Sequence, residues 1–203
     1  MGPPESLVLS LREKTGAGDF IETGTYHGNT AAWAIGHFSR VTTIELSPEF
    51  HAAAQRRFQA QPRLRVLFGH SVGLLPDVLA GLTQPAIFWL DAHWSGGETA
   101  GRDAECPVLG EIAIINASRH THAILVDDAR LFCVPPPRPH RPEHWPELAV
   151  VVNALHAGGR RYVVLHEDVL VAVAAEEKRF LADWLQAHRD EGRAQIKKWR
   201  FWK

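Results

Sequence analysis

The sequence predicts a single α/β domain, in which helices cover both faces of a doubly wound, Rossmann-like sheet of seven mostly parallel strands. Short apolar runs alternate with longer amphipathic stretches along most of the 203 residues, as successive strand–helix units require. A polar group also follows each of the first five apolar runs, where ligands bind to open α/β sheets. No internal repeat and no domain linker interrupts this pattern.

The apolar runs, together with the turn and capping residues between them, predict the strands and helices in order. Ser47 is a credible helix cap with Pro48 at the first helical position, and the five prolines within 134–142 predict a loop. Only Glu167 and Asp168 separate the last two apolar runs, so these runs are expected to pair as an antiparallel hairpin. The expected strands are 19–22, 41–45, 64–68, 86–90, 123–126, 162–166 and 169–174, and the expected helices are 28–37, one beginning at 48, 71–82, 107–118, 147–156 and 176–188.

Within the single domain, three parts are expected. Residues 19–135 form the half that binds ligands, residues 160–175 the terminal hairpin, and residues 176–203 a C-terminal helix and tail. The tail interleaves basic and aromatic residues over 197–203. Such a tail could contact nucleic acid or a membrane surface, but packing on its own domain or on a second copy is favoured, so a homodimer is possible.

Composition narrows the class of protein. Hydrophobic residues make up 45%, charged residues 22%, and the formal net charge is −1. This balance does not favour general binding of nucleic acid or of an anionic membrane. Cys106 and Cys133 lack zinc or disulfide spacing, and the N-terminus lacks a basic segment followed by an apolar one. A cytoplasmic protein is expected.

The first strand leads into a loop with a G-x-x-x-G arrangement. Gly24 and Gly28 allow close approach of a ligand to the backbone, and the following helix N-terminus offers free N–H groups to a carboxylate or phosphate. Tyr26 stands where the G-x-G-x-x-G pattern needs its second glycine, which argues against a nicotinamide dinucleotide. Glu45, at the end of the second strand, is placed to accept hydrogen bonds from both hydroxyls of a ribose. The alternative for the loop is a tight turn that binds nothing.

Four motifs follow one another along the chain: Glu22-Thr-Gly-Thr-Tyr-His-Gly-Asn-Thr, Thr43-Ile-Glu-Leu-Ser-Pro, Gly69-His-Ser-x-x-x-Leu-Pro and Phe88-Trp-Leu-Asp. In these segments, over residues 19–135, the chain resembles the class I S-adenosylmethionine-dependent methyltransferases. It is most similar to their catechol O-methyltransferase-like branch. The resemblance implies a cofactor site for S-adenosylmethionine, with the first loop at the methionine part, Glu45 at the ribose and the third strand end at the adenine. The residues so implied are Glu22, Gly24, Tyr26, Gly28, Asn29, Thr30, Glu45, Ser47, Gly69, His70, Ser71 and Asp91.

The resemblance also implies a divalent metal ion. Asp91, Asp127 and Asp128 match the carboxylates that hold Mg²⁺ in that branch, and hard oxygen ligands also suit Mn²⁺ or Ca²⁺. Asp127 and Asp128 would point to opposite faces of a regular strand, so both reach one ion only if the chain bends there. Otherwise, one of the two caps the next turn and Asp91 contacts the cofactor.

One departure from the family concerns the base that removes the acceptor proton. The family has a lysine three residues beyond the fourth-strand aspartate, whereas this chain has Trp94. His93 is the nearest replacement, with Asp91 as the other candidate catalytic residue; a metal ion alone could also lower the acceptor pKa. The glycine-rich stretch 95–103 and the proline-rich loop 134–142 are candidate flaps, although a solvated linker is the simpler reading of the latter.

The expected reaction is metal-dependent methyl transfer from S-adenosylmethionine to a hydroxyl of a small-molecule acceptor. Two alternatives stay open. One is a metal-independent methyltransferase that acts on another class of acceptor, and the other is an assembly subunit that binds the cofactor without catalysis.

Overall fold

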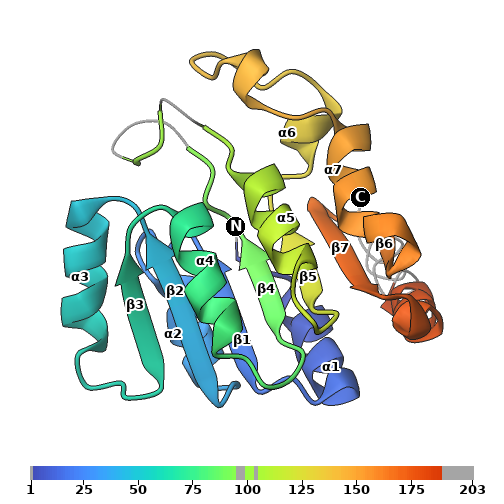
Figure 1. Cartoon of the computed structure of the whole chain (residues 1–203), viewed down its shortest axis with the longest axis horizontal. Helices are drawn as coiled ribbons and strands as arrows, with labels where there is room; N and C mark the ends of the chain where they lie inside the picture. Colours follow the sequence, from blue (N-terminus) through green and yellow to red (C-terminus); the bar gives the residue numbers. More distant parts are fainter. Residues whose placement is uncertain (1, 95–98, 103–104, 189–203) are drawn as a thin grey trace, which may run out of the picture.

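A computed structural model describes residues 2–94, 99–102 and 105–188. Its sheet has seven strands in the order β3-β2-β1-β4-β5-β7-β6, and only β7 runs antiparallel to its two neighbours. The prediction of a doubly wound, mostly parallel sheet with a terminal antiparallel hairpin is therefore confirmed (Figure 1). The strands are β1 (Asp19–Thr23), β2 (Arg40–Glu45), β3 (Leu64–Phe68), β4 (Ile87–Leu90), β5 (Ala123–Val126), β6 (Arg161–His166) and β7 (Val169–Ala174).

Helices pack on both faces of this sheet. Ser47 accepts a hydrogen bond from the Phe50 backbone N–H (3.4 Å) and Pro48 opens α3, as predicted. Residues 178–188 are helical, which agrees with the expected C-terminal helix, whereas the tail 197–203 lies outside the described residues. The α-helices are α1 (Glu5–Thr15), α2 (Asn29–Ile35), α3 (Pro48–Phe58), α4 (Ser71–Ala80), α5 (Val108–Asn116), α6 (Arg130–Cys133) and α7 (Leu148–His156), and the 3₁₀ turns are η1 (Pro142–His144), η2 (Ala157–Gly159) and η3 (Ala175–Glu177).

Two apolar cores lie on opposite faces of the sheet. Successive residues of a strand point to opposite faces, so Trp89 of β4 joins one core and Leu90 joins the other. The first core packs the sheet against α1, α2, α3 and residues 178–188, and the second packs it against α4, α5, α6 and α7. Central strands that are covered on both faces must be apolar throughout, which explains the uninterrupted runs of β4 and β5.

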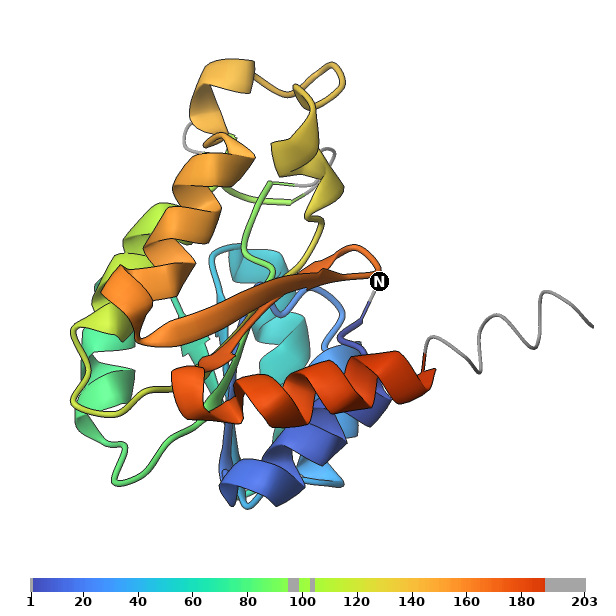
Figure 2. The same ribbon diagram turned by 90° about the vertical axis from the view of Figure 1, so that its right-hand side faces the viewer.

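The segment between α6 and α7 stands beyond the carboxyl ends of β4 and β5, next to the loop that follows β4 (Figures 1 and 2). The five parallel strands, β1 to β5, deliver their last residues to that same edge of the sheet. The fold thus gathers the predicted site residues at one edge. Among the described residues, no helix is long and apolar enough to cross a membrane.

Candidate active site

The loop between β1 and α2 owes its course to two glycines in the left-handed region. Gly24 has φ +87°, and a Cβ atom added there would lie 2.2 Å from the backbone oxygen of Asp91. Gly28 has φ +75°, and an added Cβ would meet the ring of Phe58 at 2.7 Å. Any larger residue at Gly24 would push the loop away from the end of β4, so glycine keeps the backbone of this loop against the neighbouring strand end.

Beneath the loop, Glu22 is a fully buried carboxyl group. The hydroxyl of Thr43 donates to its Oε2 at 2.6 Å, and Thr43 also pairs with Thr25 at 2.6 Å. Burial raises the pKa of Glu22 to about 8, while hydrogen bonds from Thr43 and Thr30 offset part of that rise. Because of this raised pKa, Glu22 favours its protonated form when no cation is bound nearby. It lies under the loop where the methionine part of the cofactor is predicted to bind.

Glu45, the predicted ribose ligand, holds the first loop and the start of α3 together. Its Oε2 accepts from the backbone N–H of Tyr26 (2.8 Å), and its Oε1 accepts from that of Ser47 (2.8 Å). Tyr26 itself has φ +46° and a side chain that is 51% exposed. Each carboxylate oxygen has a second lone pair, so Glu45 can still accept a hydrogen bond from a ribose hydroxyl. Farther along the loop, Asn29 accepts a hydrogen bond from Arg57 at 3.0 Å.

At the end of β3, the predicted adenine residues form the start of α4. Gly69 has φ +139°, and His70 caps α4 by accepting from the Val72 backbone N–H at 3.3 Å. The hydroxyl of Ser71 is buried and interacts with the Glu111 carboxyl group, which offsets part of the rise that burial causes in the pKa of Glu111. A hydroxyl has one donor and two lone pairs, so Ser71 keeps hydrogen-bonding capacity for a ligand.

Beyond β4, His93 lies between two carboxylates. Its Nε2 is 2.9 Å from Oδ2 of Asp128, and its Nδ1 is 3.5 Å from Oδ1 of Asp91. Burial alone would lower the pKa of His93, but the hydrogen bond to Asp128 and the charges of Asp91 and Asp128 raise it. Arg130 contacts the other oxygen of Asp128 at 2.6 Å. Burial would raise the pKa of Asp128, but His93 and Arg130 together hold it at about 2.

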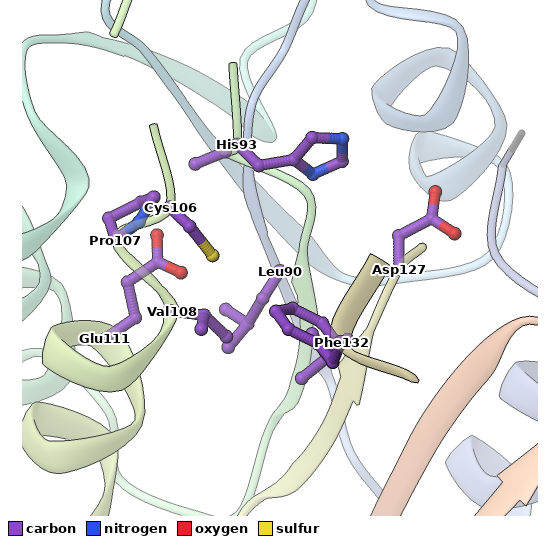
Figure 3. A pocket seen from close by; sticks show the side chains of 10 residues that line it. Leu90, His93, Cys106, Pro107, Val108, Glu111, Asp127 and Phe132 are labelled. Atoms are coloured by element: carbon purple, nitrogen blue, oxygen red, sulfur yellow. The ribbon is translucent and has the colours of Figure 1, made fainter. Parts of the chain in front are cut away.

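Asp127 faces a different neighbourhood from Asp128. The strand ends at Val126 and Asp128 takes φ +55°, so the chain bends as the sequence argument required. Asp127 accepts from the backbone N–H of Asp128 at 2.7 Å and lines a pocket of about 210 Å³, part of it open to solvent (Figure 3). Burial raises the pKa of Asp127 to about 6 and that of Asp91 to about 7. The pocket is lined by Leu90, Ala92, His93, Cys106, Pro107, Val108, Glu111, Val126, Asp127 and Phe132.

The predicted metal site gains no support from this arrangement. Both oxygens of Asp128 already pair with protein donors, one with His93 and one with Arg130. Across the described part of the chain, no group of three or more His, Cys, Asp or Glu side chains is placed to hold a metal ion. The bend that the metal prediction needed is present, but it directs Asp128 to His93 and Arg130. The donor set therefore does not fit a divalent cation as it stands.

Sequence reasoning missed several residues of this site. Arg130 also pairs with Asp168 in the β6–β7 turn, and the Arg130 backbone N–H donates to Asp168 at 2.8 Å. Glu111, on the first turn of α5, is buried in the pocket wall, and burial raises its pKa to about 6. No local motif marks these residues, because each reaches the site through tertiary packing. Charged residues within otherwise apolar segments, such as Glu111 in α5, were the available signal.

Most residues of the proline-rich loop 134–142 are exposed, as the solvated-linker reading expects. Its end is docked, because His140 and the backbone N–H of Arg141 bond to Glu105. The other candidate flap, 95–103, falls largely outside the described residues, which omit 95–98 and 103–104. In the described part of the chain, the segment between α6 and α7 contacts the pocket-lining residues His93 and Phe132 through Trp145.

Comparison with solved structures finds methyltransferases that have a similar fold. An S-adenosylhomocysteine-bound methyltransferase from Podospora anserina has a TM-score of 0.55 at 20% identity, covering 83% of this chain and 76% of that one. The fold is that of the α/β methyltransferases. A provisionally named caffeoyl-CoA O-methyltransferase from Staphylococcus aureus has a TM-score of 0.62 at 14% identity, with coverages of 83% and 81%. A provisionally named methyltransferase from Streptococcus mutans, in complex with S-adenosylhomocysteine, has a TM-score of 0.57 at 9% identity, with coverages of 86% and 99%. No family model and no curated protein matches the chain.

Proposed function

We propose that this chain is an S-adenosylmethionine-dependent methyltransferase that acts on a hydroxyl group of a small molecule. One observation carries the proposal: in an α/β methyltransferase fold, the glycine loop and Glu45 meet at adjacent strand ends, near the buried hydroxyl of Ser71. Ligands of open α/β sheets bind at this edge. Gly24 and Gly28 let the loop pack closely against the end of β4 and against Phe58, and Glu45 retains lone pairs for a ribose.

The residues present suit the parts of this cofactor. The first loop would hold the methionine part above Glu22, Glu45 would accept from the ribose, and Ser71 would bond to the adenine. When bound, S-adenosylmethionine supplies a methyl group that is already activated by its sulfonium charge. The protein then has to position the acceptor, exclude water and take up one proton.

We assign proton removal to His93. Asp128 accepts from Nε2, which keeps the proton on that nitrogen and leaves the Nδ1 lone pair free to accept a proton. Nδ1 lies 3.5 Å from Asp91, too far for a strong hydrogen bond, so the acceptor hydroxyl can compete for it. Asp91 and Asp128 stabilise the imidazolium formed during transfer, whereas Arg130 offsets part of the charge of Asp128. This route uses no step at a metal ion.

A methyl-transfer assay tests the proposal. The protein is incubated with S-adenosylmethionine and a panel of small hydroxyl compounds, with and without a chelator, and formation of S-adenosylhomocysteine is measured by mass spectrometry. We expect acceptor-dependent turnover that persists in chelator and falls by roughly 10²–10⁴-fold in His93→Gln, the usual worth of a positioned base. Turnover that needs added Mg²⁺ would restore the metal-dependent alternative. Binding of S-adenosylhomocysteine with no turnover on any compound would favour the non-catalytic alternative.

A further inference from the structure

The Glu105 carboxylate is an unassigned buried charge close to the site. Its side chain is fully buried, and three donors from the segment between α6 and α7 converge on it. The indole N–H of Trp145 donates at 2.8 Å, the backbone N–H of Arg141 at 3.0 Å and Nδ1 of His140 at 3.0 Å. On its own side, the backbone oxygen of Glu105 accepts from the Trp94 N–H at 2.7 Å. Glu105 thus joins the chain that follows β4 to the chain that precedes α7.

Two of the three donors held by Glu105, Trp145 and His140, carry aromatic rings, and that of Trp145 packs against residues of the pocket. The ring of Trp145 is 5.5 Å from that of His93 and 5.8 Å from that of Phe132, both of which line the pocket. The ring of His140 lies 5.2 Å from that of Trp94 and 5.5 Å from that of Trp145. We call this set of rings, Trp94, Phe132, His140 and Trp145, the aromatic roof.

The roof depends on Glu105 for an energetic reason. A buried carboxylate is tolerable only when donors replace its water, and bonds to a charged acceptor are about twice as strong as neutral ones. Burial would raise the pKa of Glu105, but the bonds from Trp145, Arg141 and His140 lower it below its usual range. The same bonds hold Trp145 against His93, because no other hydrogen-bonding partner of its indole appears among the described residues.

We infer that Glu105 is a positioning residue that holds the aromatic roof against His93 and against the pocket that His93 lines. The inference rests on the proposed function, in which this pocket receives the acceptor. Trp145 acts through Phe132 and His93, the two pocket residues that it touches, so its place sets both the shape of the pocket and the orientation of the imidazole.

The test compares Glu105→Ala, Glu105→Gln and Trp145→Phe with Glu143→Ala, a matched control that removes an exposed carboxyl group from the same segment. Two readouts need no acceptor: amide hydrogen exchange over residues 134–147, and the ring-proton NMR signals of His93, which sense the ring current of Trp145. Binding of S-adenosylhomocysteine, measured by calorimetry, reports on the integrity of the fold. A merely structural role of Glu105 would not move the His93 signals.

We expect exchange over 134–147 to rise by at least about tenfold in Glu105→Ala, with shifted His93 signals and unchanged S-adenosylhomocysteine binding. Glu105→Gln keeps an acceptor for Trp145 and should restore the His93 signals, and Trp145→Phe should raise exchange by a smaller factor. Wild-type exchange and His93 signals in Glu105→Ala, or the same losses in Glu143→Ala, would overturn the inference. If Glu105→Ala does not fold, unchanged exchange in both Trp145→Phe and Glu105→Gln would overturn it. Failure of wild-type protein to bind S-adenosylhomocysteine would instead count against the proposed function, since the roof readouts need no ligand.

Discussion

The two sides of the site are built in different ways. On the proposed cofactor side, backbone geometry fixes the shape: Gly24 and Gly28 adopt positive φ, and Glu45 bonds to two backbone N–H groups. On the proposed acceptor side, side chains from separate segments fix the shape, through Glu105, Trp145 and the group formed by His93, Asp128 and Arg130. The first side depends on short stretches of contiguous sequence, and the second on long-range charge pairing.

This difference predicts how each side responds to change. A backbone-built loop has no alternative arrangement, so filling its space should damage folding and cofactor binding together. A side-chain network can reorganise, so losing one member should alter local mobility or turnover while leaving cofactor binding intact. The acceptor side is thus the part where specificity can change without loss of the fold.

The largest effect is expected for Gly24→Ala. The added Cβ would lie 2.2 Å from the Asp91 backbone oxygen, in a backbone conformation that alanine disfavours. We expect a loss of about 3 kcal/mol or more in the free energy of unfolding, measured by denaturant titration. Gly16→Ala is the matched control, because Gly16 has φ +70° but open space around it, and should cost only about 1–2 kcal/mol. Equal losses in the two variants would show that the close contact with β4 is unimportant.

Glu45→Ala should come next in size. It removes the proposed ribose acceptor and the bonds to Tyr26 and Ser47. We expect binding of S-adenosylhomocysteine to weaken by about 1–3 kcal/mol in calorimetry, the worth of hydrogen bonds that involve a charged group. Glu49→Ala, on the exposed first turn of α3, should bind as wild type does. Unweakened binding in Glu45→Ala would remove Glu45 from the cofactor site.

A smaller effect concerns the pH dependence of stability. The pKa of Glu22 rises from an ordinary 4.5 to about 8 in the folded chain, so the folded state keeps a proton that the unfolded state releases. This contribution is fully present below about pH 4.5 and is lost as the pH rises through about 8. Glu22→Gln should therefore reduce the fall in unfolding free energy between pH 5 and 8. The slope should not vanish, because the pKa values of Asp91 and Glu111 are raised in the same direction. An unchanged slope in the variant would contradict the assignment.

The smallest effect is expected for added Mg²⁺. Since His93 and Arg130 occupy both oxygens of Asp128, millimolar Mg²⁺ should leave the melting temperature unchanged. A true site at a hundred times its dissociation constant would add about 2.7 kcal/mol to the unfolding free energy. Stabilisation of that order, abolished in Asp128→Asn, would show that the cation displaces His93 and Arg130 and would restore the metal site.

The sequence predicted the fold class well, but it missed the contacts around His93. The terminal hairpin, the cap at Ser47 and the glycine loop follow from local patterns, because each depends on residues near one another in the chain. The partner of His93 could not be read in the same way. Asp128 resembled a metal ligand, and only the position of Arg130, fixed by Asp168 from the distant hairpin, turns it into an ion-pair partner. The docking of Trp145 on Glu105, 40 residues away in the chain, also had no local signal.

The most direct test of the central claim is a crystal structure of the protein soaked with S-adenosylhomocysteine. The account predicts density for the ligand over the β1–α2 loop, with ribose hydroxyls within hydrogen-bonding distance of Glu45 and the adenine beside Ser71. His93 should keep its contact with Asp128, with its Nδ1 facing the sulfur side of the ligand. A ligand bound elsewhere, or a loop that stays empty at saturating concentration while NAD binds there, would contradict the account.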